Sequence, residues 1–200
     1  SQSGSLARVI VSTDDTEVAQ AARSAGVEVP FLRPAEFSSD TATSVSVVEH
    51  TLQWFERNEA WRPGAIVLLQ PTSPLRTSED IQGAIKLFNQ KAAKAVVSVS
   101  SCAHPPQWLR RIDGEGRLLP WGSEMGMPSY RQSVEPVFQL NGAIYITQRE
   151  AFLQDRTFFP EPTYAYLMPE ERSLDIDTLW DLSLAELILG KRELLHERSH

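Results

Sequence analysis

The chain has 200 residues, of which 42% are hydrophobic and 22% charged, and this composition suits one soluble domain with a substantial core. Its net charge is −7, and no basic stripe runs along it, so we expect no nucleic-acid partner. The single cysteine, Cys102, cannot form an internal disulfide, which predicts a reducing, cytoplasmic location. We find no apolar run long enough for a membrane span and no signal-peptide pattern, so we expect no membrane partner.

Strands and helices are predicted to alternate through the first half of the chain. Short β-branched or apolar runs predict strands at 8–13, 27–32, 65–70 and 93–101. Capping residues and apolar positions at helical spacing predict helices over 14–26, 44–57 and 78–88. This alternation predicts an α/β fold with a doubly wound, mostly parallel sheet.

Residues 103–140 interrupt this rhythm, and we interpret them as an arm inserted into a single domain that spans residues 1–200. A hairpin turn is predicted at Asp113–Gly114. The arm is rich in large apolar side chains, which are Trp108, Leu118, Leu119, Trp121, Met125 and Met127. Such a patch predicts the interface of a homodimer, and the alternative is a lid that folds back on its own domain. A core strand at 141–147 and a last helix ending at Gly190, before a frayed tail, complete the prediction.

Two polar loops follow predicted strands, where ligands bind in open α/β sheets. In the first loop, Gln70 offers an amide, followed by hydroxyls and the cation of Arg76; the alternative is a rigid turn without chemistry. In the second loop, Arg33 suits a phosphate or a base edge. Ser44 lies at a helix N-terminus, where backbone amides favour anions, and the alternative there is plain capping by Asp40 or Thr43.

Asp175 and Asp177 lie one residue apart, just before the last helix. In an extended segment both carboxylates point to the same side, and Mg²⁺ often takes one or two carboxylates together with substrate phosphates. The alternative is that Asp177 or Thr178 caps the helix, with Asp181 completing a box-like arrangement. His50, on the predicted helix 44–57, is expected to be structural or exposed rather than catalytic.

Five stretches together resemble one family. They are "RVIVSTDD", "LRPAEFSSDTATS", "LLQPTSPLRT", "LNGAIYI" and "SLDIDTLWDLSLAE". In order and approximate spacing they are similar to the cytidylyltransferases that activate nine-carbon α-keto sugar acids, the N-acylneuraminate (CMP-sialic acid synthetase) type. The resemblance implies a Rossmann-like nucleotidyltransferase sheet, with residues 103–140 as the family's dimerisation arm.

The resemblance also implies a role for each matching residue. Arg33 and Ser44 would bind the cytidine nucleotide. The sugar acid would be bound by Gln70, Asn141 and Gly142. Asp175 and Asp177 would be catalytic as ligands of the cofactor Mg²⁺. The implied substrates are CTP and a nonulosonic acid, and the implied products are the CMP-sugar and pyrophosphate.

Two departures from the family pattern accompany the resemblance. Family members open with a glycine- and basic-rich loop that grips the triphosphate, and no such segment precedes Ser1. A polypeptide that began at Ser1 is expected to be a catalytically weak or inactive relative, acting as a dimeric ligand- or partner-binding module; a longer one would carry the loop. Gln139 also stands where many relatives have a basic residue nearby, which leaves the identity of the sugar acid open.

Overall fold

The computed structural model describes residues 6–39, 41–102, 104, 108–121 and 136–197. The chain divides into two compact units. The first comprises Ser1–Gln70, Arg76–Val97 and Ile144–Tyr166, and the second comprises Pro71–Leu75, Ser98–Ala143 and Leu167–His200. Among the residues it covers, no helix is both long and apolar enough to cross a membrane.

The three predicted helices of the first unit are present, and each begins at a side-chain cap. They are α1 (Thr16–Ser24), α2 (Ser44–Glu59) and α3 (Ser78–Gln90). Asp15 caps α1 by accepting hydrogen bonds from two backbone amides, and Thr43 caps α2. Thr77 and Asp80 form a reciprocal capping box at α3. Because caps are local features of the sequence, all three starting points were predictable.

The strands match the sequence less closely. Three predicted strands are observed as β1 (Ala65–Leu68), β2 (Ala95–Ser101) and β5 (Phe138–Gln148). The short helix α4 (Arg149–Asp155) and the strand β6 (Thr163–Leu167) were not predicted. The sheet has the order β1-β5-β2-β6.

The predictions of regular strands at 8–13 and 27–32 are wrong for the described structure. Their backbones form no continuous ladder but two isolated parallel bridges, which join Ile10 to Glu28 and Thr13 to Leu32. Pro30 lies between the bridged positions of the second segment, and proline has no N–H to donate to a ladder.

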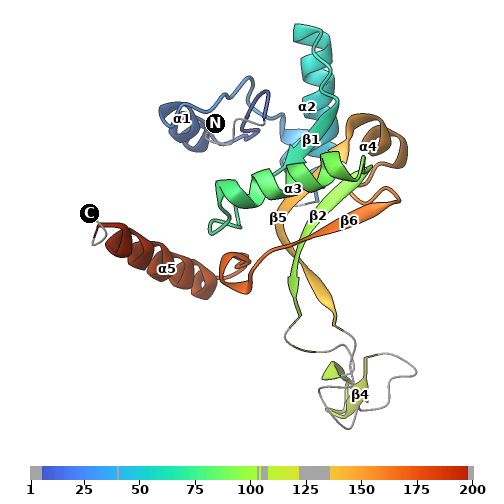
Figure 1. Ribbon diagram of the computed structural model, residues 1–200, viewed down its shortest axis with the longest axis vertical. Helices are drawn as coiled ribbons and strands as arrows, with labels where there is room; N and C mark the ends of the chain where they lie inside the picture. Colours follow the sequence, from blue (N-terminus) through green and yellow to red (C-terminus); the bar gives the residue numbers. More distant parts are fainter. Residues whose placement is uncertain (1–5, 40, 103, 105–107, 122–135, 198–200) are drawn as a thin grey trace. The chain divides into compact units, whose positions relative to one another are not determined.

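The sheet is mixed, because β1 and β5 pair antiparallel, with Leu68 opposite Tyr145. Strand β5 runs antiparallel to β2 as well, since Cys102 donates to the carbonyl of Val137 at one end and Gln148 donates to that of Lys94 at the other, both at 2.9 Å. The connection between β2 and β5 carries a hairpin (Figure 1), whereas a parallel return needs a crossover, usually a helix.

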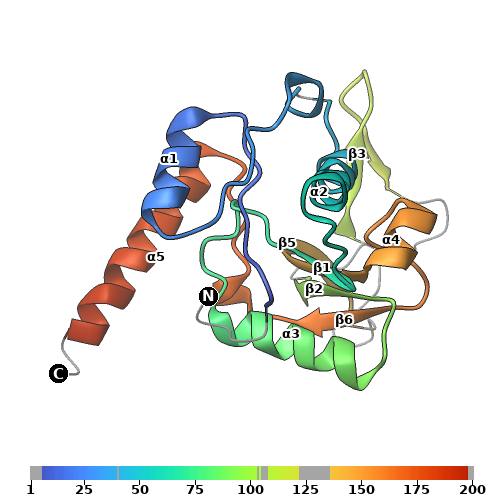
Figure 2. The ribbon, with the colours of Figure 1, turned by 90° about the horizontal axis from the view of Figure 1, so that it is seen from above.

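Helices cover both faces of the sheet in the first unit, with α2 and α4 on one face and α3 on the other (Figure 2). The core of the first face consists of Leu52, Phe152 and Phe158, packed against Ile66, Leu68 and Tyr145 from the strands. Strand β6 meets α3 closely, because a Cβ on Gly83 would lie 2.4 Å from the hydroxyl oxygen of Tyr166.

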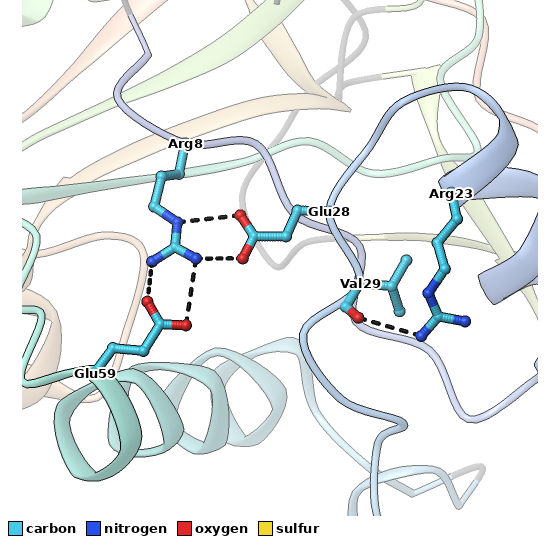
Figure 3. Close-up of polar contacts among 5 residues, drawn as sticks. All are labelled: Arg8, Arg23, Glu28, Val29 and Glu59. Carbon is cyan, nitrogen blue, oxygen red and sulfur yellow. Dashed lines mark hydrogen bonds and ion pairs between the residues drawn. The ribbon is translucent and has the colours of Figure 1, made fainter.

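Arg8 ties the start of the described chain to the rest of the first unit (Figure 3). Its guanidinium pairs with the carboxylates of Glu59 and Glu28, which raise the pKa of Arg8 above its ordinary value. The same group stacks over the rings of Phe55 and Trp61, at 4.5 and 5.0 Å from their centroids. This cluster holds the bridged segments against the end of α2.

The predicted hairpin of the second unit is confirmed as β3 (Arg110–Ile112) and β4 (Leu118–Pro120). Asp113 organises its turn, because one carboxylate oxygen accepts hydrogen bonds from the amides of Glu115 and Arg117, both at 2.9 Å. Of the apolar residues predicted for the arm, Met125 and Met127 lie outside the described residues.

The last helix, α5 (Leu179–Glu197), runs past Gly190, so the predicted stop is wrong, and so is the predicted frayed tail as far as Glu197. The flanking residues are good helix formers, and one interior glycine costs only about 1 kcal/mol relative to alanine.

Candidate functional site

The predicted site residues are divided between the two units. Arg33, Ser44 and Gln70 lie in the first unit. The second unit contains the other four, which are Asn141, Gly142, Asp175 and Asp177.

Asp175 has an unusual environment. Its residue is half-buried, and its Oδ1 atom is buried without a hydrogen-bond partner in the described structure. A buried carboxylate oxygen without a partner is costly, and such atoms are rare in folded proteins. An oxygen of this kind is available to a cation.

The segment that contains Asp175 is held by a backbone contact within the second unit. The amide of Ile176 donates to the carbonyl of Thr72 at 2.8 Å. Residues 173–177 are not part of a sheet. One backbone bond therefore fixes the residue between the two aspartates.

The contacts at the start of α5 show whether the carboxylates of Asp175 and Asp177 cap this helix. Asp181 accepts hydrogen bonds from the amide of Thr178 at 2.8 Å and from its hydroxyl at 2.7 Å, and Thr178 accepts in return from the amide of Asp181 at 3.3 Å. The Thr178 hydroxyl is the main cause that lowers the pKa of Asp181. Asp177 takes part in this cap only through its backbone amide, and its side chain is exposed. The carboxylates of Asp175 and Asp177 therefore take no part in the cap.

The donor chemistry of these two residues fits a magnesium ion. No group of three or more potential ligands among His, Cys, Asp and Glu is found in the described parts of the chain, so no complete protein cage is present there. Mg²⁺ is usually bound by one or two carboxylates, with water and substrate phosphates completing its octahedron. The unpartnered oxygen of Asp175 and the exposed carboxylate of Asp177 suit that mode of binding.

Asn141 is 4% exposed and lies in β5, at the centre of a hydrogen-bond network in the second unit. Its Oδ1 accepts from the hydroxyl of Ser98 at 2.6 Å and from the amide of Ala143 at 3.2 Å. Its Nδ2 donates to the hydroxyl oxygen of Ser173 at 2.9 Å and to the sulfur of Met168 at 3.5 Å. The next residue, Gly142, is buried and has a φ of +72°, which side chains of L-residues rarely adopt.

In the first unit, Gln70 follows β1 and is half-buried. Its backbone oxygen accepts a hydrogen bond from Arg76 at 3.2 Å. Burial lowers the pKa of the Arg76 guanidinium, and the nearby Asp80 opposes that effect. The hydrogen bond from Arg76 orders the loop after β1. It uses the backbone oxygen of Gln70, so the side-chain amide takes no part in it.

Arg33 is anchored on three sides within the first unit. Its guanidinium donates to the hydroxyl of Ser38 at 3.0 Å and to the carbonyl of Ser12 at 3.4 Å, and it forms an ion pair with Asp14 at 3.0 Å. Ser44 is exposed at the first position of α2, which Thr43 caps as the alternative interpretation expected. Asp40, the other predicted cap, lies outside the described residues.

Comparisons with known proteins identify the family of this chain. A family model described as cytidylyltransferase matches residues 1–111, which is more than half of the chain. The chain belongs to the cytidylyltransferase family. The CMP-N,N'-diacetyllegionaminic acid synthase of Legionella pneumophila is 33% identical over 195 residues, which cover 94% of this chain and 80% of that relative. These matches confirm the family resemblance found in the sequence.

Two further relatives bear on length and fold. The N-acylneuraminate cytidylyltransferase of Escherichia coli O18:K1:H7 is 34% identical over 96% of this chain, which spans only 44% of that relative. The structure of a CMP:2-keto-3-deoxy-manno-octonic acid synthetase complexed with CTP aligns with a TM-score of 0.63 at 14% identity, covering 96% of this chain and 85% of that one. The structural alignment confirms the predicted nucleotidyltransferase fold class.

His50 of this cytidylyltransferase-family chain is structural, as the sequence indicated. Its ring packs against Phe31 and Phe37, with centroids 5.0 and 4.7 Å away. Burial lowers the pKa of His50, and its Nδ1 has no hydrogen-bond partner among the described residues. The ring of His50 thus packs within an aromatic cluster.

The sequence did not identify Ser98 and Ser173, the two hydroxyl partners of Asn141. A signal existed for Ser98, because Ser98 and Ser100 are hydroxyl residues among the apolar residues of a predicted buried strand, and buried hydroxyls need partners. Ser100 and Ser173 also line a small polar cavity of about 240 Å³, together with Ser101, His104, Gln139 and Glu170. Gln139, at which the resemblance leaves the identity of the sugar acid open, is thus one of the residues that line this cavity.

Proposed function

We propose that this protein transfers the cytidylyl group of CTP to a nonulosonic acid. The anomeric hydroxyl oxygen forms a bond to the α-phosphorus, the bond from that phosphorus to the bridging oxygen breaks, and pyrophosphate leaves with the electron pair. The hydroxyl proton passes to solvent. The observation that carries this proposal is the acidic pair Asp175 and Asp177, whose carboxylates are free of the α5 cap in a chain of the cytidylyltransferase family.

Asp175 and Asp177 are proposed to hold Mg²⁺ against the phosphates of CTP. Bound there, the ion would supply neutralisation of the charge that develops on the phosphoryl oxygens. The two residues bind and orient, and no covalent intermediate with the protein is required. The unpartnered Oδ1 of Asp175 supports this role.

The remaining roles follow the family resemblance. Arg33 and Ser44 are proposed to bind the nucleotide, and Gln70 and Gly142 to lie along the sugar acid. An amide such as that of Gln70 suits hydroxyl and N-acyl groups, because it both donates and accepts. We also propose a cytoplasmic location, in keeping with the single cysteine.

The direct test measures pyrophosphate release with CTP and a panel of nonulosonic acids, namely N-acetylneuraminic, legionaminic and pseudaminic acids. An eight-carbon keto-sugar acid and the nucleotides UTP and ATP serve as controls. We expect release with CTP and at least one nine-carbon acid only. Binding of CTP without any release would instead support a ligand-binding role without turnover.

A charge-competition experiment tests the nucleotide role of Arg33. We expect Arg33→Ala to raise the KM for CTP about 10- to 100-fold, because charge-assisted hydrogen bonds to phosphate contribute about 1.5–3 kcal/mol. Asp14→Asn removes the carboxylate paired with Arg33 and should leave that KM unchanged or lower it. Equal KM values in wild type and Arg33→Ala would remove Arg33 from the nucleotide site.

The arm is proposed to form a two-fold homodimer that brings it near the partner's sugar pocket. The hairpin exposes apolar side chains, with Ile112 and Leu118 opposite each other at 72% and 70% exposed, and Trp121 at 68%. An exposed apolar surface of this kind is typical of an interface. We expect light scattering to give a dimer, and Ile112→Lys with Leu118→Lys to give a monomer. A wild-type monomer at micromolar concentration would rule out this assembly.

A further inference from the structure

We infer that Asn141 is a positioning residue, which fixes the segment carrying Asp175, rather than a ligand of the sugar acid. The inference rests on the proposed function and changes the role that the family resemblance gives to this side chain. It follows from three observations on the second unit, concerning the amide itself, its link to Asp175, and its burial.

The side-chain amide of Asn141 has no hydrogen-bonding capacity left over. A primary amide has two N–H donors and one oxygen with two lone pairs. Ser98 and the amide of Ala143 donate to the oxygen, at 2.6 and 3.2 Å. The nitrogen donates to Ser173 and, more weakly, to the sulfur of Met168, at 2.9 and 3.5 Å. A sugar hydroxyl could bind only by displacing one of these four partners.

Ser173 links Asn141 to the backbone segment that contains Asp175. Its hydroxyl accepts a hydrogen bond from Asn141 and donates one to the carbonyl of Pro169 at 2.8 Å, so this hydroxyl acts as both acceptor and donor. Its own amide donates to the carbonyl of Glu170 at 3.0 Å, closing the turn Glu170–Arg172. Ser173 is therefore fixed two residues before Asp175.

A second anchor lies on the other side of Asp175, where the amide of Ile176 donates to the carbonyl of Thr72 at 2.8 Å. Asp175 thus lies between two fixed points, Ser173 and Ile176. A half-buried carboxylate would turn toward solvent if its backbone were loose, because its Oδ1 has no partner. The anchored backbone keeps this oxygen in place.

Burial supports the same interpretation. Asn141 is 4% exposed, and Ser98 on the neighbouring strand is 1% exposed. The network therefore joins β2, β5 and the segment before α5 through closed contacts inside the second unit. Such outer residues hold metal ligands in position, and their loss typically costs 10- to 100-fold in metal affinity or activity.

The experiment compares Asn141→Ala and Ser173→Ala with two reference variants. Ser173→Thr retains the hydroxyl and should restore the wild-type properties. Ser183→Ala removes a hydroxyl that only contacts the carbonyl of Leu179 on exposed α5, and it should have no effect. Three readouts are hydrogen exchange at residues 174–177, Mn²⁺ binding in the presence of CTP followed by electron paramagnetic resonance, and steady-state kinetics.

We expect Asn141→Ala and Ser173→Ala to speed exchange of the Ile176 amide at least tenfold and to weaken Mn²⁺ binding about 10- to 100-fold. Their kcat should fall while the KM for the sugar acid stays within about twofold of wild type. If Asn141→Ala does not fold, the measurements on Ser173→Ala alone test the inference. This substitution removes only the hydroxyl group and breaks the hydrogen bond between Asn141 and Ser173.

Two results would overturn the inference. One is a tenfold rise in the sugar-acid KM of Asn141→Ala with unchanged exchange at Ile176, which would make Asn141 a ligand. The other is unchanged exchange and Mn²⁺ binding in Ser173→Ala. If the wild type releases no pyrophosphate with any sugar acid, the proposed function fails while the exchange measurement still decides the role of Asn141.

Discussion

Asp175→Ala is expected to lower CTP-dependent turnover about a thousandfold, while its unfolding temperature stays equal to that of the wild type or rises. The loss corresponds to about 4 kcal/mol of transition-state stabilisation, the scale expected when a metal that neutralises phosphoryl charge is lost. Stability should not fall, because the Oδ1 of Asp175 is buried without a partner. Removing an unsatisfied buried polar atom relieves its desolvation cost.

The control for Asp175→Ala is Glu186→Ala, which removes the same charge from an exposed position on α5. It should change neither turnover nor unfolding temperature. Asp175→Asn gives a second comparison, because it keeps the shape and removes the charge, and it should be as inactive as the alanine variant. Near-normal turnover of both Asp175→Ala and Asp177→Ala would contradict the metal assignment.

Local features of the sequence account for the parts of the fold that could be predicted. The starts of α1, α2 and α3 follow from Asp15, Thr43 and Thr77, each of which bonds to amides within three residues of itself. Segment pairing depends on distant partners and was predicted less well. Pro30 breaks the pairing of one predicted strand, and β5 pairs antiparallel with β1 although many residues separate them.

In the candidate site, too, local contacts could be predicted from the sequence and contacts between distant residues could not. The acidic pair was recognisable because only one residue separates Asp175 from Asp177 in the sequence, and the cap made by Thr178 and Asp181 is equally local. The network around Asn141 was not recognisable, because its partners Ser98 and Ser173 are 43 and 32 residues away. A resemblance can name a residue in such a network, but only its contacts show whether its hydrogen bonds are already used.

Gly142→Ala is expected to reduce both stability and turnover, whereas the matched variant Gly26→Ala should reduce stability alone. Both glycines have left-handed backbone conformations, with φ values of +72° and +74°. An L-residue in that conformation costs about 1–2 kcal/mol. For a chain of this length we expect each variant to unfold about 2–8 °C below the wild type.

The two variants should differ in activity because of their neighbours. Gly26 lies just after α1 in the first unit, and an added Cβ there meets no atom within 4 Å. Gly142 directly follows Asn141 in buried β5, and a change in its φ rotates the peptide that orients the Asn141 network. Since that network is proposed to position Asp175, we expect kcat of Gly142→Ala to fall at least tenfold, with the KM for CTP little changed. Equal kcat in the two variants would show that the backbone at Gly142 serves folding and not the site.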